Sequence, residues 1–287
     1  MRWLVQIVRR VVFTGGAFLL FFAVGALLSY AVLPLARRRA GSPERGAARC
    51  RRIVRRTWIA FHDYMRWCGL LHYEPRATRL ELPPSGAVLV ANHPTLVDVT
   101  ALVTAAPDLV FVAKRQMFRN LLVGPLLRAC GHIESDVGIF SGAAVVEEAV
   151  ARLERGCSVL VFPEGTRSPK GAIGPFFSGA FEIAVRANVP IVPVLIRSDP
   201  PALIRGQRWH EIPERTVRLT VTQLATVPPP LGRAAVARDQ VRSIYVELLQ
   251  RAASGEAAAI PPPSPAALEE TTWKSWSVRS SSSSSRA

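Results

Sequence analysis

The chain has 287 residues, of which 49% are hydrophobic, and its 36 Lys and Arg against 21 Asp and Glu give a formal net charge of +15. This length and apolar content suffice for one sizeable domain with appendages. The charge predicts a polyanionic partner, either a nucleic acid or an anionic membrane surface. Because the sequence has no helix-turn-helix, zinc-knuckle or aromatic-basic pattern, we expect no nucleic acid among the partners. Four scattered cysteines without C-x-x-C spacing indicate a reducing compartment and small buried side chains.

An uncharged segment, residues 11–36, lies near the start of the chain after Arg9 and Arg10. As a helix rising about 1.5 Å per residue, it would exceed a hydrocarbon core of about 30 Å. Its length, and the three arginines at 37–39 that follow it, argue against a cleavable signal peptide. We therefore predict a membrane anchor helix over residues 1–40, with the main domain in the cytoplasm because positive flanks stay inside. A helix that lies within one leaflet fits the same residues equally well.

The next segment, residues 41–78, is strongly basic. Nine arginines and a single Glu lie between Arg37 and Arg56. Apolar residues recur at steps of three and four from Cys50 to Tyr73, which predicts an amphipathic helix. We interpret this helix as interfacial, lying against anionic headgroups. The alternative is a surface helix that packs on its own domain, because periodicity does not identify the partner.

Residues 79–253 alternate between short apolar runs and helical stretches. The runs predicted as buried strands are Val88–Ala91, Leu109–Ala113, Ser158–Phe162 and Ile191–Ile196. The stretches predicted as helices are Leu96–Ala105, Arg119–Cys130, Ala143–Arg155 and Ser178–Asn188. This alternation predicts an α/β fold with a mostly parallel or mixed sheet flanked by helices, in addition to the N-terminal membrane-anchoring helices.

The end of the chain is expected to add three further segments. Thr216–Gln223 alternates with period two and predicts a strand with one exposed face, and Val236–Ala252 predicts a closing helix. Residues 254–287 are rich in Pro and Ser, cannot bury a core, and are predicted to be a disordered tail.

The segment Asn92-His93-Pro94-Thr95-Leu96-Val97-Asp98 follows the first predicted strand. Pro94 suits a first helical turn, and the helix dipole favours a carboxylate at position 98 near the helix start. The imidazole of His93 can reach back to Asp98, which would fix its tautomer and raise the basicity of its other nitrogen. Because no G-x-S-x-G motif or reactive cysteine context is present, His93 is predicted to activate a hydroxyl that belongs to a substrate. A His-x4-Asp spacing alone is equally typical of a structural turn.

The segment Phe162-Pro163-Glu164-Gly165-Thr166-Arg167-Ser168 follows the third predicted strand. Glu164 offers an acceptor for hydroxyls, and Arg167 offers a planar donor for phosphate or carboxylate. Gly165 permits close approach of the backbone to a ligand. Because α/β sheets place their chemistry at strand ends, we expect this segment and the His93 segment to form two walls of one site. By itself, the segment is also compatible with a surface turn that holds a local ion pair.

Together these segments resemble the signatures of the lysophosphatidic acid (1-acylglycerol-3-phosphate) acyltransferase family. A third block, Val189-Pro190-Ile191-Val192-Pro193-Val194, completes the resemblance in the family's order, and the similarity spans roughly Leu80 to Gln223. The family resemblance implies transfer of a fatty acyl group from acyl-CoA or acyl carrier protein to a lysophospholipid hydroxyl at a membrane surface. It implies His93 as general base, Asp98 as its orienting partner, and no metal, cofactor or covalent intermediate.

The resemblance also implies an acceptor site and a location. The residues implied to bind the substrate are Glu164, Gly165, Thr166 and Arg167. The implied partners are the lipid bilayer, a lysolipid acceptor, and acyl-CoA or acyl carrier protein. The implied location is a bacterial inner membrane, with the active domain on its cytoplasmic face.

One block departs from the family's pattern. Val137 stands where the family has an Arg that assists phosphate binding. Candidate replacements for this anion-binding residue are Lys114, Arg115 and Arg119, which are equally typical of solvated charges at a strand exit. A subgroup associated with aryl polyene lipid biosynthesis lacks the same Arg, so a non-phosphatidate acceptor or an aryl polyene-type acyl chain is the alternative function. A non-catalytic membrane-binding scaffold is the alternative from another class.

Overall fold

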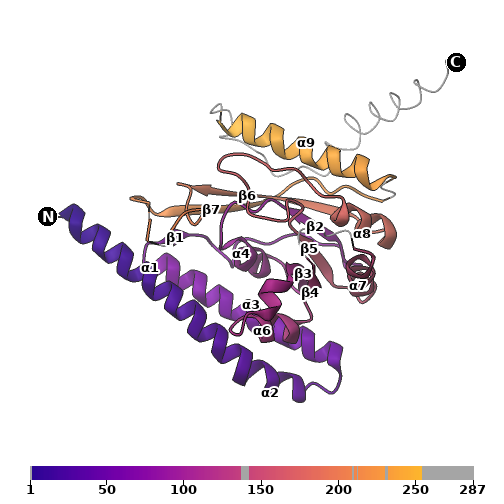
Figure 1. The fold of residues 1–287 in the computed structure, drawn as a ribbon, viewed down its shortest axis with the longest axis horizontal. Helices are drawn as coiled ribbons and strands as arrows, with labels where there is room; N and C mark the ends of the chain where they lie inside the picture. Colours follow the sequence, from indigo (N-terminus) through magenta and orange to yellow (C-terminus); the bar gives the residue numbers. More distant parts are fainter. Residues whose placement is uncertain (1, 137–141, 209, 212, 230–231, 254–287) are drawn as a thin grey trace.

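One mixed sheet organises the molecule (Figure 1). The computed structural model describes residues 2–136, 142–208, 210–211, 213–229 and 232–253. Within them, seven strands pair in the order β1-β7-β6-β2-β5-β3-β4. The strands are β1 (Leu71–His72), β2 (Val88–Ala91), β3 (Leu109–Lys114), β4 (Ile133–Ser135), β5 (Ser158–Val161), β6 (Ile191–Asp199) and β7 (Val217–Gln223). Neighbours run parallel except β6 and β7, so the sheet is mixed, as predicted.

Helices connect the parallel strands and cover both faces of the sheet (Figure 1). They are α1 (Arg2–Leu27), α2 (Leu33–Arg38), α3 (Pro43–Trp67), α4 (Asp98–Ala105), α5 (Arg115–Arg119), α6 (Gly124–Cys130), α7 (Ala143–Glu154), α8 (Gly179–Ala187) and α9 (Ala234–Ala253), with a π-helical segment η1 (Leu28–Val32) between α1 and α2. The predicted helices between the strands are all found, within five residues at each end. The predicted tail, 254–287, and Val137 lie outside the described residues.

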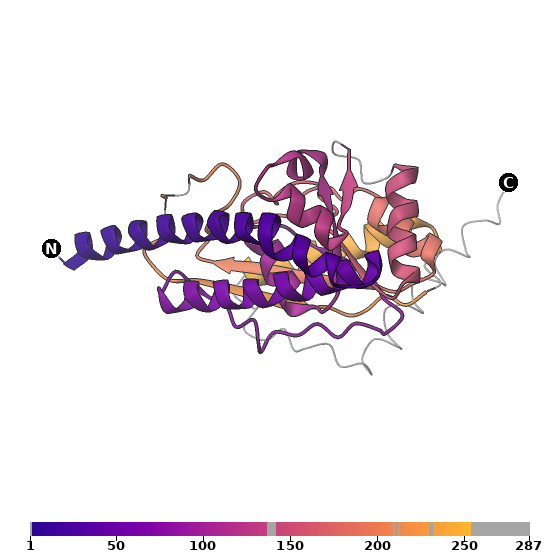
Figure 2. The same cartoon turned by 90° about the horizontal axis from the view of Figure 1, so that it is seen from below.

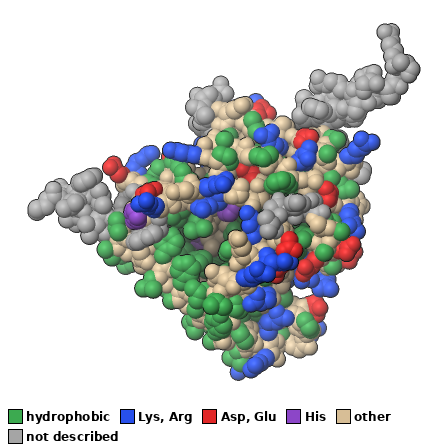
Figure 3. Space-filling view, viewed as in Figure 1, with side chains coloured by type: hydrophobic (Ala, Val, Ile, Leu, Met, Phe, Trp, Pro, Cys, Tyr) green, Lys and Arg blue, Asp and Glu red, His purple; other side chains and the backbone are tan. Residues whose placement is uncertain are grey.

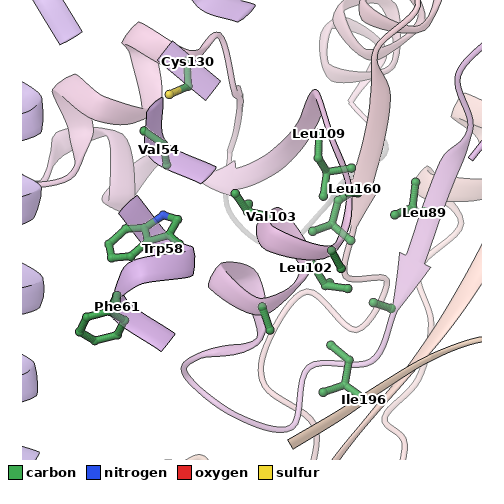
Figure 4. Close-up of a cluster of buried hydrophobic side chains, with 14 of the residues drawn as sticks. Val54, Trp58, Phe61, Leu89, Leu102, Val103, Leu109, Cys130, Leu160 and Ile196 are labelled. Atoms are coloured by element: carbon green, nitrogen blue, oxygen red, sulfur yellow. The ribbon is translucent and has the colours of Figure 1, made fainter. Parts of the chain in front are cut away.

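The alternation of side chains along the strands divides the core into two layers. Leu89 and Leu160 point to one face of the sheet, where α3 and α4 pack against them (Figure 4). Val88 and Val159 point to the other face, where α7, α8 and α9 pack. Because successive residues of a strand face opposite sides, an almost wholly apolar strand is what a sheet covered on both faces requires.

The N-terminal helix runs without a break from α1 through η1 to α2. Pro34 lies at the start of α2 and has no backbone N–H to donate, so the turn before it widens and the Leu33 N–H bonds to the Leu28 carbonyl instead. Within the described residues, 11–38 is the one helix long and apolar enough to cross a membrane. This helix lies beside α3 along much of its length (Figure 2), with Phe21 stacked on Trp58 at 5.1 Å between ring centroids.

The basic helix α3 packs on its own domain, which corrects the interpretation of its apolar side chains as membrane-facing. Ser42 caps it, accepting from the Arg45 N–H, and Pro43 occupies its first turn. Its apolar side chains Val54, Trp58 and Phe61 are buried against α1, α4 and the sheet (Figure 4). The predicted helix also extended to Tyr73, but α3 ends at Trp67 and β1 follows, because Gly69 adopts a positive φ of 71° that ends the helix.

Candidate active site

His93 and Asp98 form a hydrogen-bonded pair at the end of β2. The His93 Nδ1 lies 2.8 Å from Asp98 Oδ2, and the carboxylate is fully buried. Asp98 also accepts from the Thr95 N–H at 2.6 Å and from the Thr95 hydroxyl. Because an ionised carboxylate only accepts, Nδ1 carries the imidazole proton and Nε2 is left with a free lone pair. The geometry thus supplies a base whose tautomer is fixed.

Two further contacts hold the His93 ring and backbone. The ring stacks on Phe162 at 4.3 Å between centroids, so the residue after β5 supports the residue after β2. Asn92 extends the pairing of β2 with β6: its side chain accepts from the Ile196 N–H at 2.7 Å and donates to the Ile196 carbonyl at 2.9 Å. The sequence does not indicate that Asn92 joins two strands, because that role depends on β6 lying beside β2.

Glu164 and Ser168 join the two predicted walls of the site through hydrogen bonds. The β2 and β5 strands are neighbours, with Val90 opposite Val161, so their exits meet. The His93 N–H donates to the Ser168 hydroxyl at 3.1 Å and to Glu164 Oε1 at 3.3 Å, and the Ser168 N–H donates to the His93 carbonyl at 2.8 Å. The two segments therefore lie together, as the sequence predicted.

The Glu164 carboxylate is used inside the protein. Its Oε1 accepts from the Ser168 hydroxyl at 2.5 Å, and its Oε2 accepts from the Gly174 N–H at 2.8 Å. The residue is 4% exposed. A Cβ on Gly174 would lie 3.0 Å from Oε2, so this close approach favours glycine. The geometry makes Glu164 a brace beneath the His93 backbone, and its predicted substrate contact stays a prediction.

The turn at Gly165 presents Thr166 to solvent and aims Arg167 at a neighbouring loop. Gly165 has a φ of 64°, which a side chain would disfavour. Nη1 of Arg167 donates to the carbonyls of Leu203 and Ile204 at 3.0 and 3.2 Å. In the described part of the chain, Nη1 is the nitrogen of Arg167 that makes hydrogen bonds. Nε and Nη2 are the donors that an anionic group could use.

A mostly apolar cavity of about 290 Å³ lies beside the His93 segment, on the face of the sheet that α1, α3 and α4 cover. Residues from several parts of the chain line it, among them Phe18, Phe21, Trp58, Leu96, Val103 and Leu203. Thr95, Leu96 and Val97 connect it to the His93–Asp98 pair. A space of this kind suits an unbranched hydrocarbon chain.

Two buried histidines belong to this same layer. Burial lowers the pKa of His132 to about 3, with the charges of Arg51 and Arg152 adding to the effect, and burial lowers the pKa of His62 to about 4. His132 lines the cavity and stacks on Phe111 at 3.7 Å. Both rings are therefore neutral near pH 7. Neither was singled out by the sequence, because an isolated His in an apolar context carries no spacing signal.

The three candidate anion-binding residues differ in their surroundings. Arg115 bonds to Glu134 at 2.9 Å and to Asp136 at 2.5 Å, so two carboxylates already neutralise it. Lys114 and Arg119 are exposed at the end of β3 and in α5. Since β3 is separated from β2 by β5, these side chains lie one strand beyond the Glu164 segment.

The cysteines offer no competing nucleophile. All four are buried and free. Burial raises the pKa of the thiols of Cys50, Cys130 and Cys157, which keeps them protonated at neutral pH.

Comparison with known proteins gives a family match over the region that carries the site. Residues 76–197 match the family model described as Acyltransferase. A 1-acyl-sn-glycerol-3-phosphate acyltransferase alpha from Mus musculus is 33% identical over 150 residues, covering 51% of this chain and 50% of that protein. The Homo sapiens alpha protein is 38% identical over 120 residues, covering 40% and 42%. The chain thus spans half or less of the length of these curated relatives.

A solved structure matches over most of the chain. The 1-acyl-sn-glycerophosphate (LPA) acyltransferase PlsC from Thermotoga maritima aligns with a TM-score of 0.66 and 19% identity, covering 87% of this chain and 98% of that one. At this identity the likeness concerns the fold.

Proposed function

We propose, from the match of residues 76–197 to the Acyltransferase family model, that the chain is a membrane-bound O-acyltransferase. It transfers a fatty acyl group from a thioester, either acyl-CoA or acyl carrier protein, to the free hydroxyl of a lysophospholipid of the 1-acylglycerol-3-phosphate type. The observation that carries this proposal is the His93–Asp98 pair beside an apolar cavity. The names of the curated relatives support the same substrate class.

The chemistry follows from the free lone pair on His93 Nε2. This nitrogen takes the proton of the acceptor hydroxyl as the oxygen attacks the thioester carbonyl carbon. The resulting imidazolium is stabilised by the buried Asp98 carboxylate at 2.8 Å. When the tetrahedral intermediate collapses, the carbon–sulfur bond breaks and the departing thiolate takes the proton back from Nε2. The products are an ester and a free thiol, and His93 returns to its starting tautomer.

The cavity and the Arg167 loop supply binding on either side of this chemistry. Phe18, Phe21 and Trp58 line the space in which the acyl chain lies. Arg167 reaches the acceptor headgroup with the nitrogens that the Leu203 and Ile204 carbonyls leave free. Glu164 acts on the reaction through the His93 backbone that it holds.

The membrane arrangement that fits these contacts is a helix lying along one leaflet. α1 contacts α3 through Phe21 on Trp58 and Phe13 on Trp67. Crossing the bilayer would carry the exposed arginines of α3, such as Arg52 and Arg56, into hydrocarbon, where an unpaired charge is costly. We place the catalytic domain on the cytoplasmic face of a bacterial inner membrane, because the arginines that follow α1 favour that side.

A second candidate acceptor is favoured by one contact. Arg115 is paired with Glu134 and Asp136, which leaves fewer free cations at this edge of the sheet for a phosphate. In this version the chemistry is the same, and the acceptor is a lipid other than lysophosphatidic acid, or the acyl chain is of the aryl polyene type.

The test is a product analysis with purified full-length protein. Mixed lysolipids are incubated with acyl-CoA and acyl carrier protein donors, and the new esters are identified by mass spectrometry. The proposal predicts acylated lysophosphatidic acid, lost by roughly a hundredfold or more in His93→Gln. His72→Gln, at an exposed histidine outside the site, serves as the matched control. Undiminished transfer by His93→Gln contradicts the mechanism, and products from other lysolipids alone would favour the second acceptor class.

A further inference from the structure

The end of α5 and the start of its connection to α6, residues 117–122, which we call the turn, expose large apolar side chains. Leu121 is 78% exposed, and Met117 and Leu122 are also exposed. Turns on a water-facing surface usually carry polar residues, because their backbone groups and side chains are solvated. Three apolar side chains exposed within six residues of chain therefore call for a covering partner.

The backbone of this turn is built rigidly. Asn120 Oδ1 accepts from the N–H groups of Leu122 and Val123 at 2.9 and 3.1 Å. Gly124 lies so close to the Phe118 carbonyl that an added Cβ would approach that oxygen to 2.1 Å. The turn is thus fixed in a shape that holds the leucines outward, and they do not reach the core by local rearrangement.

Hydrogen bonds tie the turn to the N-terminal helix. The Ser29 hydroxyl donates to the Leu122 carbonyl at 2.8 Å, and the Tyr30 hydroxyl donates to the Leu121 carbonyl at 2.5 Å. These contacts join residues more than ninety positions apart in the sequence. Because Tyr30 and Leu121 are both exposed, the turn extends the outward face of the helix.

The outward face of α1 is itself apolar. Leu19 is 72% exposed, and Phe22 and Leu27 are exposed beside it. Figure 3 shows hydrophobic side chains gathered along the edge that α1 and α2 form, with Lys and Arg side chains beside them. Together, α1 and the turn make one apolar edge, composed of Leu19, Phe22, Leu27, Tyr30, Leu121 and Leu122.

The charges around this apolar edge select its partner. Neither residues 2–43 nor residues 109–133 contain an Asp or Glu. Arg38, Arg39 and Arg119 are exposed in these same segments. An apolar strip flanked by cations and free of carboxylates complements an anionic bilayer, with leucines among acyl chains and arginines at headgroup phosphates.

We propose that the turn of residues 117–122 is a membrane-contacting element in its own right, which inserts beside α1 into one leaflet of an anionic bilayer. This inference rests on the membrane association in the proposed function and adds a second point of contact to it. Because the turn contacts the leaflet beside α1, the protein is fixed in rotation about the α1 axis. The cavity that Leu96 lines is then held at a constant height relative to the leaflet.

A fluorescent label at the turn tests this contact directly. The four native cysteines are buried, so a polarity-sensitive maleimide dye attaches selectively to Leu121→Cys in the full chain. The matched control is Val236→Cys, which is 50% exposed on α9 across the sheet from α1. Vesicles of phosphatidylglycerol and phosphatidylcholine should shift the dye at 121 to shorter wavelength and allow lipid-borne quenchers to reach it, while the dye at 236 stays unchanged. An unquenched dye at 121 on vesicle-bound protein overturns the proposal.

A charge substitution gives an independent readout. Leu121→Glu combined with Leu122→Glu should lower the vesicle partition coefficient about tenfold or more, because two leucines no longer enter the leaflet. Val236→Glu should leave it unchanged, and thermal unfolding verifies that all variants are folded. Partitioning equal to that of the wild type overturns the proposal. If the double variant changes from dimer to monomer but still binds vesicles, the proposal is also overturned, because a second copy of the chain would then be the partner that covers the apolar edge. Vesicle binding is measured without substrates, so protein that binds vesicles through the turn but acylates nothing counts against the proposed function alone.

Discussion

The two faces of the sheet have the same kind of apolar strands beneath them but are packed differently. On one face, α7, α8 and α9 close over the sheet with fully buried Phe181 and Tyr245. On the other, α1, α3 and α4 leave a cavity of about 290 Å³ lined by Phe18, Phe21 and Trp58. Natural cores fill their space at crystal-like density, so an apolar cavity beside the His93–Asp98 pair is consistent with the acyl-chain site that we propose there. In that proposal one face contributes stability, and the other gives up some packing for binding.

The closed face should be the more sensitive to a large deletion. Phe181→Ala removes a fully buried ring between α8 and the sheet, so we expect the free energy of unfolding to fall by about 3–5 kcal/mol. Phe21→Ala removes a partly buried ring that already borders empty space, so its cost should be clearly smaller. Urea unfolding of both variants measures the difference. Equal losses would remove the distinction between the two faces.

Glu164→Gln separates bracing from substrate binding at the strand ends. The carboxylate accepts from Ser168 and Gly174 at once, and an amide would turn one acceptor into a donor and leave a buried N–H unpaired. We expect kcat to fall by roughly ten- to a hundredfold with little change in the acceptor KM, since the His93 backbone shifts. Thr166→Ala, in the exposed part of the same turn, is the control. A large rise in KM at constant kcat would instead support direct contact with the acceptor.

On the open face, the same Phe21→Ala substitution should alter selectivity. Enlarging the cavity favours longer or bulkier acyl chains, and a methylene is worth about 1 kcal/mol in such a pocket, which is about fivefold in relative kcat/KM. Competing thioesters of increasing length measure this preference. An unchanged profile would mean that the acyl chain lies elsewhere.

Another expected effect concerns acid stability. His62 titrates at about pH 4 in the folded protein and near 6.5 in the unfolded chain. Below about pH 6.5 the unfolded state therefore binds a proton that the folded state does not, and stability falls as pH decreases toward 4, by up to about 1.4 kcal/mol per pH unit. His62→Gln should remove this part of the slope, and His72→Gln should retain it because His72 is exposed. Unfolding at a series of pH values checks both variants. If stability depends on pH in His62→Gln as it does in the wild type, the His62 ring takes up its proton over the same pH range in the folded and unfolded protein.

The sequence predicted those features that depend on local periodicity or on a dense motif. The run Val88–Ala91 is a strand with the predicted bounds, and the His93 and Glu164 segments lie together as expected. Strands β1 and β4 were missed, because two- and three-residue strands carry no period and form only when a neighbour pairs with them.

Partners that are distant in sequence account for the remaining differences. The sequence of α3 has the same apolar periodicity whether that side of the helix faces lipid or α1. The Phe21–Trp58 stack shows that it packs against α1. Likewise, nothing near Glu164 in the chain indicates that its carboxylate accepts from the Gly174 N–H, and its substrate contact stays a prediction. The sequence also predicts a helix over Arg119–Cys130, because nothing near Leu121 in the chain indicates that its carbonyl accepts from the distant Tyr30 hydroxyl.

Asp98→Asn tests whether Asp98 holds His93 as the base for an acceptor hydroxyl. The substitution keeps the shape of the side chain but can present an N–H to Nδ1, which favours the wrong tautomer. Acyl transfer to the lysolipid should be measured across pH with the wild type and the variant, alongside the unfolding free energy. We expect the Asp98→Asn protein to be folded and its rate to be lower on the order of a hundredfold or more at every pH. A folded Asp98→Asn protein that transfers acyl groups at the wild-type rate would contradict it.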